Sequence, residues 1–244
     1  AFFIQSLAKP VVITGSQIPL SEVRNDARTN LITALLVAAS TELAEVCLLF
    51  GDKLLRGCRA TKVDADALDA FDSPNCPPLG AIGVKVEMDR TRVLRPGTGR
   101  VTLAEPLAGA TVGAFRLFPG ISPDLLRNVL QPPLQGLVLE AYGVGNGPDR
   151  DSVFLSVLRE ATARGVVIVV CTQCLRGGVE LGSYATGASL ARAGVVSGYD
   201  MTPEAALCKL FYLFSTGHSP AEVRRKMGKN LRGELTLPAT YSVG

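Results

Sequence analysis

The first apolar positions of the chain alternate between strand-like runs and a helical pattern. Val11 to Ile13 and Val46 to Phe50 are short, continuous apolar runs, which are typical of strands buried in a parallel sheet. Between them, residues 30–39 carry apolar side chains at the spacing of one helix face. A strand, a helix and a second strand in this order predict a βαβ unit.

The second half of the chain repeats this alternation more regularly. The sequence predicts strands over residues 115–118, 136–140 and 166–171, and a helix over residues 151–164. Three further helix starts carry Ser or Thr, then Pro, then an acid in the first turn, at Ser122, Thr202 and Ser219. Ser219 and Glu222 also have capping-box spacing. We therefore expect a parallel sheet covered by helices on both faces.

The polar stretch between the two halves, rich in Arg, Gly and Thr, is the candidate linker. This predicts a domain over residues 1–90, a linker over 91–110 and a domain over 111–244. Phe2 to Leu7 resembles the second half of an apolar helix that ends before Pro10. A helix without its own start suggests that the first domain is truncated.

Composition narrows the class of protein. The 244 residues are 47% hydrophobic and 19% charged, with a net charge of +3. No apolar run approaches the roughly 18 residues of a membrane span, and no Lys/Arg cluster is interleaved with aromatic residues, so neither a membrane nor a nucleic-acid role is expected. Several of the six cysteines lie in apolar runs, which predicts free thiols in a soluble, cytoplasmic protein.

The motifs that suggest a cofactor or a metal fail on their spacing. The loop 143–147 is rich in glycine, but Pro148 stands where a dinucleotide fingerprint needs its third glycine. Cys171 and Cys174 lack the second ligand pair that zinc requires, because His218 is the only histidine. The same scarcity leaves a Ser/His/Asp triad without support. We expect no cofactor and no metal.

Lys62 and Asn146 are the residues with a possible chemical role, and each has two interpretations. Lys62 lies between two arginines, Arg56 and Arg59, and a run of four aspartates. It is either a solvated partner in surface ion pairs or a desolvated lysine that neighbouring cations make able to accept a proton. Asn146 either forms a turn or projects its amide towards a polar ligand.

Five segments, in this order along the chain, resemble the type I, cytoplasmic-type L-asparaginases, and most closely the asparaginase region of the vertebrate 60 kDa lysophospholipase-like asparaginases. The segments are residues 11–19 (VVITGSQIP), 55–62 (LRGCRATK), 69–78 (DAFDSPNCPP), 142–146 (YGVGN) and 230–236 (NLRGELT). The resemblance implies an α/β fold of two parallel-sheet domains of asparaginase type, the N-terminal one truncated. It also implies hydrolysis of L-asparagine to L-aspartate and ammonia without a cofactor, by a threonine nucleophile and a Thr-Asp-Lys group, in a homo-oligomer built as a dimer of dimers.

The resemblance carries over to individual residues. Lys62 matches the lysine of the Thr-Asp-Lys group, which assists proton transfer. Asn146 and Glu204 match substrate-side positions given to a neighbouring subunit's site, although Glu204 is equally explained as a first-turn helix acid. Thr61 and Cys174 match positions of an allosteric effector site; Glu140 replaces an arginine there, so activation by substrate is not expected.

Two departures from the family pattern limit what this polypeptide is expected to do. Residues 1–244 contain neither the TGGT-like segment that carries the nucleophile nor the GTDT-like segment with the Thr-Asp pair. We therefore expect an L-asparaginase fragment that is inactive alone. The alternative is a non-catalytic paralogue that acts as a binding or oligomerisation module. A lysophospholipid hydrolase is suggested only by the name of its relatives.

Overall fold

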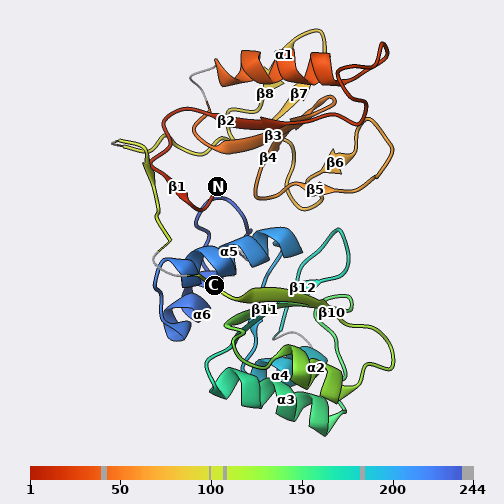
Figure 1. Ribbon diagram of the computed structural model, residues 1–244, viewed down its shortest axis with the longest axis vertical. Helices are drawn as coiled ribbons and strands as arrows, with labels where there is room; N and C mark the ends of the chain where they lie inside the picture. The colour runs from red at the N-terminus through yellow and green to blue at the C-terminus, as the bar shows by residue number, and fades with distance from the viewer. Residues whose placement is uncertain (40–42, 99, 107–108, 182–184, 238–244) are drawn as a thin grey trace, which may run out of the picture. The chain divides into compact units, whose positions relative to one another are not determined.

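The computed structural model describes residues 1–39, 43–98, 100–106, 109–181 and 185–237. The chain forms two compact units, residues 1–104 and 105–244, which are described separately (Figure 1). Each unit combines β-sheet with α-helical structure, so the α/β class predicted from the sequence is confirmed.

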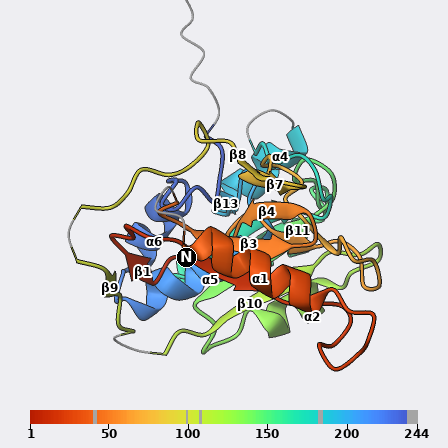
Figure 2. The same cartoon turned by 90° about the horizontal axis from the view of Figure 1, so that it is seen from above.

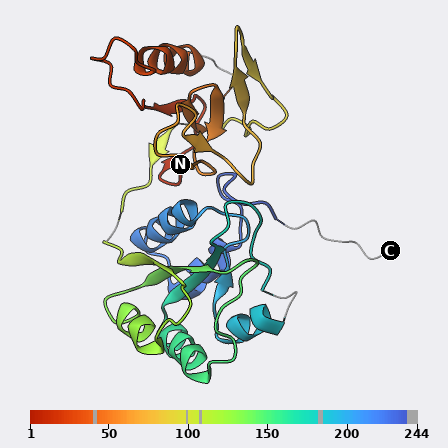
Figure 3. The same cartoon turned by 90° about the vertical axis from the view of Figure 1, so that its right-hand side faces the viewer.

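The second unit is built on a parallel sheet. Its strands lie in the order β10 (Val112–Arg116), β11 (Gly136–Ala141), β12 (Val167–Thr172) and β13 (Val196–Ser197). One face carries α2 (Pro123–Val129), α3 (Ser152–Ala163) and α4 (Ala185–Arg192), and the other α5 (Pro203–Ser215) and α6 (Pro220–Met227) (Figures 1 and 3). Every residue of β12 is buried, which explains why this strand is continuously apolar.

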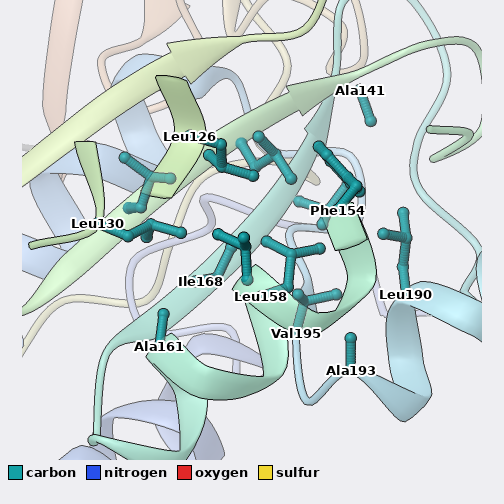
Figure 4. Packing of buried hydrophobic residues seen from close by; sticks show 14 of the residues in the cluster. Leu126, Leu130, Ala141, Phe154, Leu158, Ala161, Ile168, Leu190, Ala193 and Val195 are labelled. Carbon is teal, nitrogen blue, oxygen red and sulfur yellow. The ribbon is translucent and has the colours of Figure 1, made fainter. Parts of the chain in front are cut away.

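The side chains of β12 supply both cores of the second unit. Ile168 and Val170 face α2, α3 and α4, where they pack with fully buried Phe154 and Leu158 (Figure 4). Val167, Val169 and Cys171 point to the opposite face and pack against α5 and α6. Because successive side chains of a strand alternate between faces, one strand contributes to two separate clusters.

The helix starts predicted from the sequence are confirmed by their hydrogen bonds. The hydroxyls of Ser122 and Thr202 accept from the backbone N–H of Asp124 and Ala205, at 3.2 Å in each case. At α6 the capping box is complete, since Ser219 Oγ accepts from the N–H of Glu222 and the Glu222 carboxylate accepts from the N–H of Ser219. These contacts satisfy donors that would otherwise be unpaired at the helix ends.

A fully buried ion pair fixes the segment that follows α6. Lys209 Nζ of α5 lies 2.5 Å from Glu234 Oε1, and both side chains are 0% exposed. Lys209 also donates to the carbonyl oxygens of Met227 and Lys229. Burial alone would raise the pKa of Glu234, but the Lys209 ammonium and backbone N–H groups outweigh it and lower the pKa.

The first unit contains a mixed sheet. Its strands lie in the order β2 (Val11–Thr14), β3 (Val46–Phe50), β4 (Lys53–Arg56), β7 (Gly80–Ile82) and β8 (Val86–Met88). Only β2 and β3 run parallel, so the parallel sheet expected here extends over one strand pair. The strand direction reverses between β3 and β4, at the two-residue turn Gly51–Asp52. Gly51 there adopts the positive φ of 59° that such hairpin turns require.

Helix α1 (Ala27–Ala38) packs on β2 and β3, as Figures 1 and 2 show. The predicted helix is confirmed, but its inward face is formed by Asn30, Thr33, Ala34 and Val37. Leu31 and Leu35 are exposed by 47% and 63%. The polar side chain of Asn30 is tolerated at this buried position because its Nδ2 donates to the carbonyl oxygen of Gly15 at 2.9 Å.

The expectation of a helix over Phe2 to Leu7 is wrong. Strand β1 (Ile4–Gln5) pairs antiparallel with β9 (Thr102–Leu103), which lies within the segment expected to be a linker. An apolar side chain is buried here without a helix, since Phe2 is only 4% exposed. Of the helices in the described ranges, none combines the length and apolar character that crossing a membrane requires.

Candidate active site

Lys62 lies on a short ribbon in the first unit. Strand β5 (Thr61–Lys62) pairs antiparallel with β6 (Phe71–Asp72), so that Lys62 stands opposite Phe71. Its Nζ lies 5.6 Å from the centre of the Phe71 ring. The centre of the Phe71 ring lies 5.0 Å from the centre of the Phe50 ring of β3. The exposed ammonium is therefore positioned by an aromatic ring that packs on the sheet.

Gln17 makes the second contact that positions Lys62. Its Oε1 accepts from Lys62 Nζ at 2.9 Å, while its Nε2 donates to the carbonyl oxygen of Ala65 at 2.9 Å. Gln17 belongs to the polar loop that follows β2, at the carboxyl end of a parallel strand. The amide joins this loop to the loop that follows β5.

Asp26 holds the Gln17 loop in place. Its carboxylate accepts from the backbone N–H of Gln17 at 3.0 Å and of Ile18 at 2.9 Å, and also from Asn30 Nδ2. Burial alone would raise the pKa of Asp26, but the hydrogen bonds from Ile18, Gln17 and Asn30 lower it. Sequence patterns did not indicate this support, because its partners lie in a loop and a helix.

The interpretation of Lys62 as a desolvated lysine beside two free cations, Arg56 and Arg59, does not match the structure. Arg56 Nε binds Glu45 Oε2 at 2.6 Å in a mostly buried pair, and Arg59 is buried with 4% of its surface exposed. Burial would lower the pKa of Arg56, but Glu45 outweighs it and raises the pKa. Lys62 is itself exposed, so a lysine buried beside two free cations is not what the structure shows.

The first aspartates after Lys62 lie in a turn and not in a helix. Asp64 Oδ1 accepts from the backbone N–H of Asp66 at 2.7 Å and of Ala67 at 2.9 Å, as Asx turns do. These N–H groups are the main reason that the pKa of Asp64 is lowered, with a smaller contribution from Lys62. Further along, Asp72 pairs with Lys53 at 3.8 Å.

The other candidate residues are spread over both units. Asn146 closes a turn after β11, because its backbone exchanges hydrogen bonds with Tyr142 of 2.9 and 2.7 Å. Glu204 is an exposed acid in the first turn of α5. Thr61 is half-buried on β5 in the first unit, whereas Cys174 is exposed in the second. The geometry thus fits a turn-forming role for Asn146 and a first-turn helix role for Glu204, and their substrate-side roles stay predictions.

The cysteines show no geometry of a metal centre or a disulfide. All six are free thiols, and no group of three or more His, Cys, Asp or Glu side chains able to hold a metal ion occurs in the described ranges. Cys171 is buried, which raises the pKa of its thiol to about 12, with smaller contributions from the charges of Glu140 and Glu204.

Both units match family models of known proteins. Residues 1–94 match the family model "Asparaginase, N-terminal", and residues 111–227 match "Glutaminase/Asparaginase C-terminal domain". L-asparaginase 1 of Escherichia coli (strain K12) is 47% identical over 236 residues, which are 97% of this chain and 69% of that protein. The chain belongs to the asparaginase family.

Two further relatives support this assignment. The 60 kDa lysophospholipase of Mus musculus is 46% identical over 246 residues, which cover 98% of this chain but only 42% of the mouse protein. The crystal structure of L-asparaginase I from Vibrio cholerae matches with a TM-score of 0.89 and 45% identity, over 97% of this chain and 71% of that structure. The family resemblance stated from the sequence motifs is confirmed.

Proposed function

We propose that residues 1–244 belong to an L-asparaginase that hydrolyses L-asparagine to L-aspartate and ammonia, in which Lys62 transfers protons. The observation that carries the proposal is the position of Lys62. Its Nζ is oriented by Gln17 and the Phe71 ring at the loop after β2, in a chain 47% identical to an L-asparaginase. Loops at the carboxyl ends of parallel strands are where α/β proteins bind ligands.

The reaction needs a group that handles protons. Overall, water supplies the oxygen of a new carbon–oxygen bond at the side-chain amide carbon of asparagine, the carbon–nitrogen bond breaks, and the nitrogen leaves as ammonia after gaining a proton. The Lys62 ammonium can donate a proton and, once neutral, take one back. Positioned proton transfer of this kind contributes about 10²- to 10⁴-fold to a rate.

The remaining expectations form part of the same proposal. Asn146 and Glu204 would contact the substrate bound at a neighbouring subunit's site in a homo-oligomer, and Thr61 and Cys174 would be remnants of an effector site. No cofactor is needed for the hydrolysis. A cytoplasmic location fits the six free thiols.

We further propose that the polypeptide of residues 1–244 does not hydrolyse asparagine alone, because it contains neither a TGGT-like nor a GTDT-like segment. Purified polypeptide and its Lys62→Ala variant should release ammonia from L-asparagine at the same background rate. Release by the parent polypeptide above that of the variant would contradict this part of the proposal.

A chimera tests the role of Lys62 separately. In it, the matched region of Escherichia coli L-asparaginase 1 is replaced by residues 1–244 of this chain. We expect the chimera to hydrolyse asparagine, and Lys62→Ala to lower kcat by about 10²-fold or more. Lys85→Ala, at an exposed lysine of the same unit, is the matched control and should leave kcat unchanged.

The outcomes of the chimera experiment separate the two hypotheses. A folded chimera without activity would favour the non-catalytic paralogue. An active chimera in which Lys62→Ala and Lys85→Ala behave alike would support the asparaginase but remove Lys62 from the reaction.

A further inference from the structure

A pocket of about 400 Å³ opens at one edge of the second unit. Its walls come from the ends of α3 and α4, the start of α6 and the turns that lead into β12 and β13. Since Gly165 and Gly194 in these turns precede their strands, the pocket lies at the amino-terminal ends of β12 and β13. Asn146 and Glu204 follow the carboxyl ends of β11 and β13, so they belong to the opposite edge of the sheet.

Three arginines from three different helices line this pocket. They are Arg159 of α3, Arg192 of α4 and Arg224 of α6. No acidic residue is among the described residues that line it. Arg159 and Arg192 are exposed and Arg224 is half-buried. Three guanidinium groups and no carboxylate among the lining residues make the site positive, in a chain whose net charge is +3.

The hydrogen bonds of these arginines leave most of their donors available. Arg192 donates to Ser189 Oγ at 2.9 Å, and Arg224 donates to the carbonyl oxygen of Gly194. In the described part of the chain, no ion pair within 4.0 Å includes any of the three, and the guanidinium of Arg159 makes no hydrogen bond. Each guanidinium carries five N–H donors, so several remain for a ligand.

Two carboxylates close in sequence to these arginines are directed to other partners. Glu160, beside Arg159, accepts from Ser156 Oγ at 3.0 Å. Glu222 of α6 folds back onto the backbone N–H and the hydroxyl of Ser219 in the capping box. Both carboxylates are therefore engaged about one turn or less from their own positions, and neither is among the residues that line the pocket.

We propose that this arginine pocket binds a small phosphorylated molecule. The planar fork of arginine matches the oxygens of a phosphate group and can hold two of them at once. The volume suits a ligand of metabolite size, and Thr162, Ala163 and Pro220 offer smaller, partly apolar surfaces to the rest of the molecule.

The position of the pocket predicts how such a ligand acts. Because the arginines lie at the opposite edge of the sheet from Asn146 and Glu204, the phosphorylated molecule does not compete for those residues. It bridges α3, α4 and α6, and should therefore stabilise the second unit when it binds. The inference does not depend on the proposed hydrolysis, since its test measures binding and not activity.

Inorganic pyrophosphate is the probe, titrated calorimetrically into the 244-residue polypeptide at constant ionic strength. We expect saturable binding. Arg159→Gln and Arg192→Gln should each raise the Kd about tenfold or more, because each removes a charge-assisted hydrogen bond. Arg150→Gln removes the same charge from an exposed arginine of this unit outside the pocket and should change the Kd less than about twofold.

Thermal melting of each variant without ligand confirms folding, and Arg159 is the safer site because its guanidinium holds no described partner. If Arg159→Gln melts early, Arg192→Gln decides the question. The absence of saturable binding up to about 10 mM pyrophosphate would overturn the proposal. So would equal weakening by Arg150→Gln, which would show that only the overall charge attracts the anion.

Discussion

The buried pair between Lys209 and Glu234 offers the most direct test of the energetics of the second unit. Lys209→Met keeps the length of the side chain but removes its charge. It leaves the Glu234 carboxylate buried without its cation and the carbonyl oxygens of Met227 and Lys229 without a donor. Breaking a fully buried pair in this way costs about 3–5 kcal/mol of the free energy of unfolding.

The assay follows from the distribution of tyrosines. All five lie beyond residue 141, in the second unit, and the chain has no tryptophan. Intrinsic tyrosine fluorescence during urea unfolding therefore reports on that unit alone. With a urea dependence of about 2 kcal/mol per molar, we expect Lys209→Met to lower the unfolding midpoint by about 2 M.

Two further variants show whether the effect belongs to the pair. Lys229→Met changes an exposed lysine of the same segment and should leave the midpoint in place. The double variant Lys209→Met/Glu234→Leu removes both charges and should recover part of the stability, because an apolar pair avoids the buried charge. A loss below about 1 kcal/mol for Lys209→Met would refute this reasoning.

Three other outcomes follow from the structure. The pKa of Glu234 is lowered on folding, so this carboxylate stabilises the folded state above its unfolded pKa of about 4.3, and the stabilisation is lost as the pH falls through the folded pKa. Glu234→Gln should therefore flatten the acid side of the plot of unfolding free energy against pH. An unchanged plot would contradict this. Exposed Cys174 and Cys208 should react with a thiol reagent in the native protein at pH 8, whereas buried Cys171, with a pKa of about 12, should react only on unfolding, as mass mapping would show. Gly198→Ala should lower the free energy of unfolding by about 1–3 kcal/mol in the same urea assay, because its Cβ would lie 2.7 Å from Cys171 Sγ; wild-type stability would count against this packing.

Sequence patterns predicted the second unit better than the first, for a physical reason. Strands β11 and β12 are buried on both faces and read as continuous apolar runs, and the helix caps have short, local signals. In the first unit, β5, β6 and β9 contain two residues each, too few to show any period. Their positions depend on pairing between distant segments, which local patterns do not encode.

The candidate site was predictable only in part. Residue type and spacing left Lys62 between two interpretations, and the family resemblance alone singled it out. The partner that orients it, Gln17, lies 45 residues away in sequence, so no local pattern joins them. The arginine pocket likewise draws Arg159, Arg192 and Arg224 from three helices, and only the fold brings them together.

The bridging amide of Gln17 restricts which residues evolution can place at this position. Its oxygen accepts from Lys62 and its nitrogen donates to the carbonyl oxygen of Ala65. A glutamate keeps the acceptor but loses the donor, a lysine does the reverse, and a methionine loses both. Asparagine carries both groups on a shorter side chain that does not reach as far. Among variants of this chain that retain the geometry of Lys62, position 17 should therefore admit fewer substitutions than the exposed residues around it.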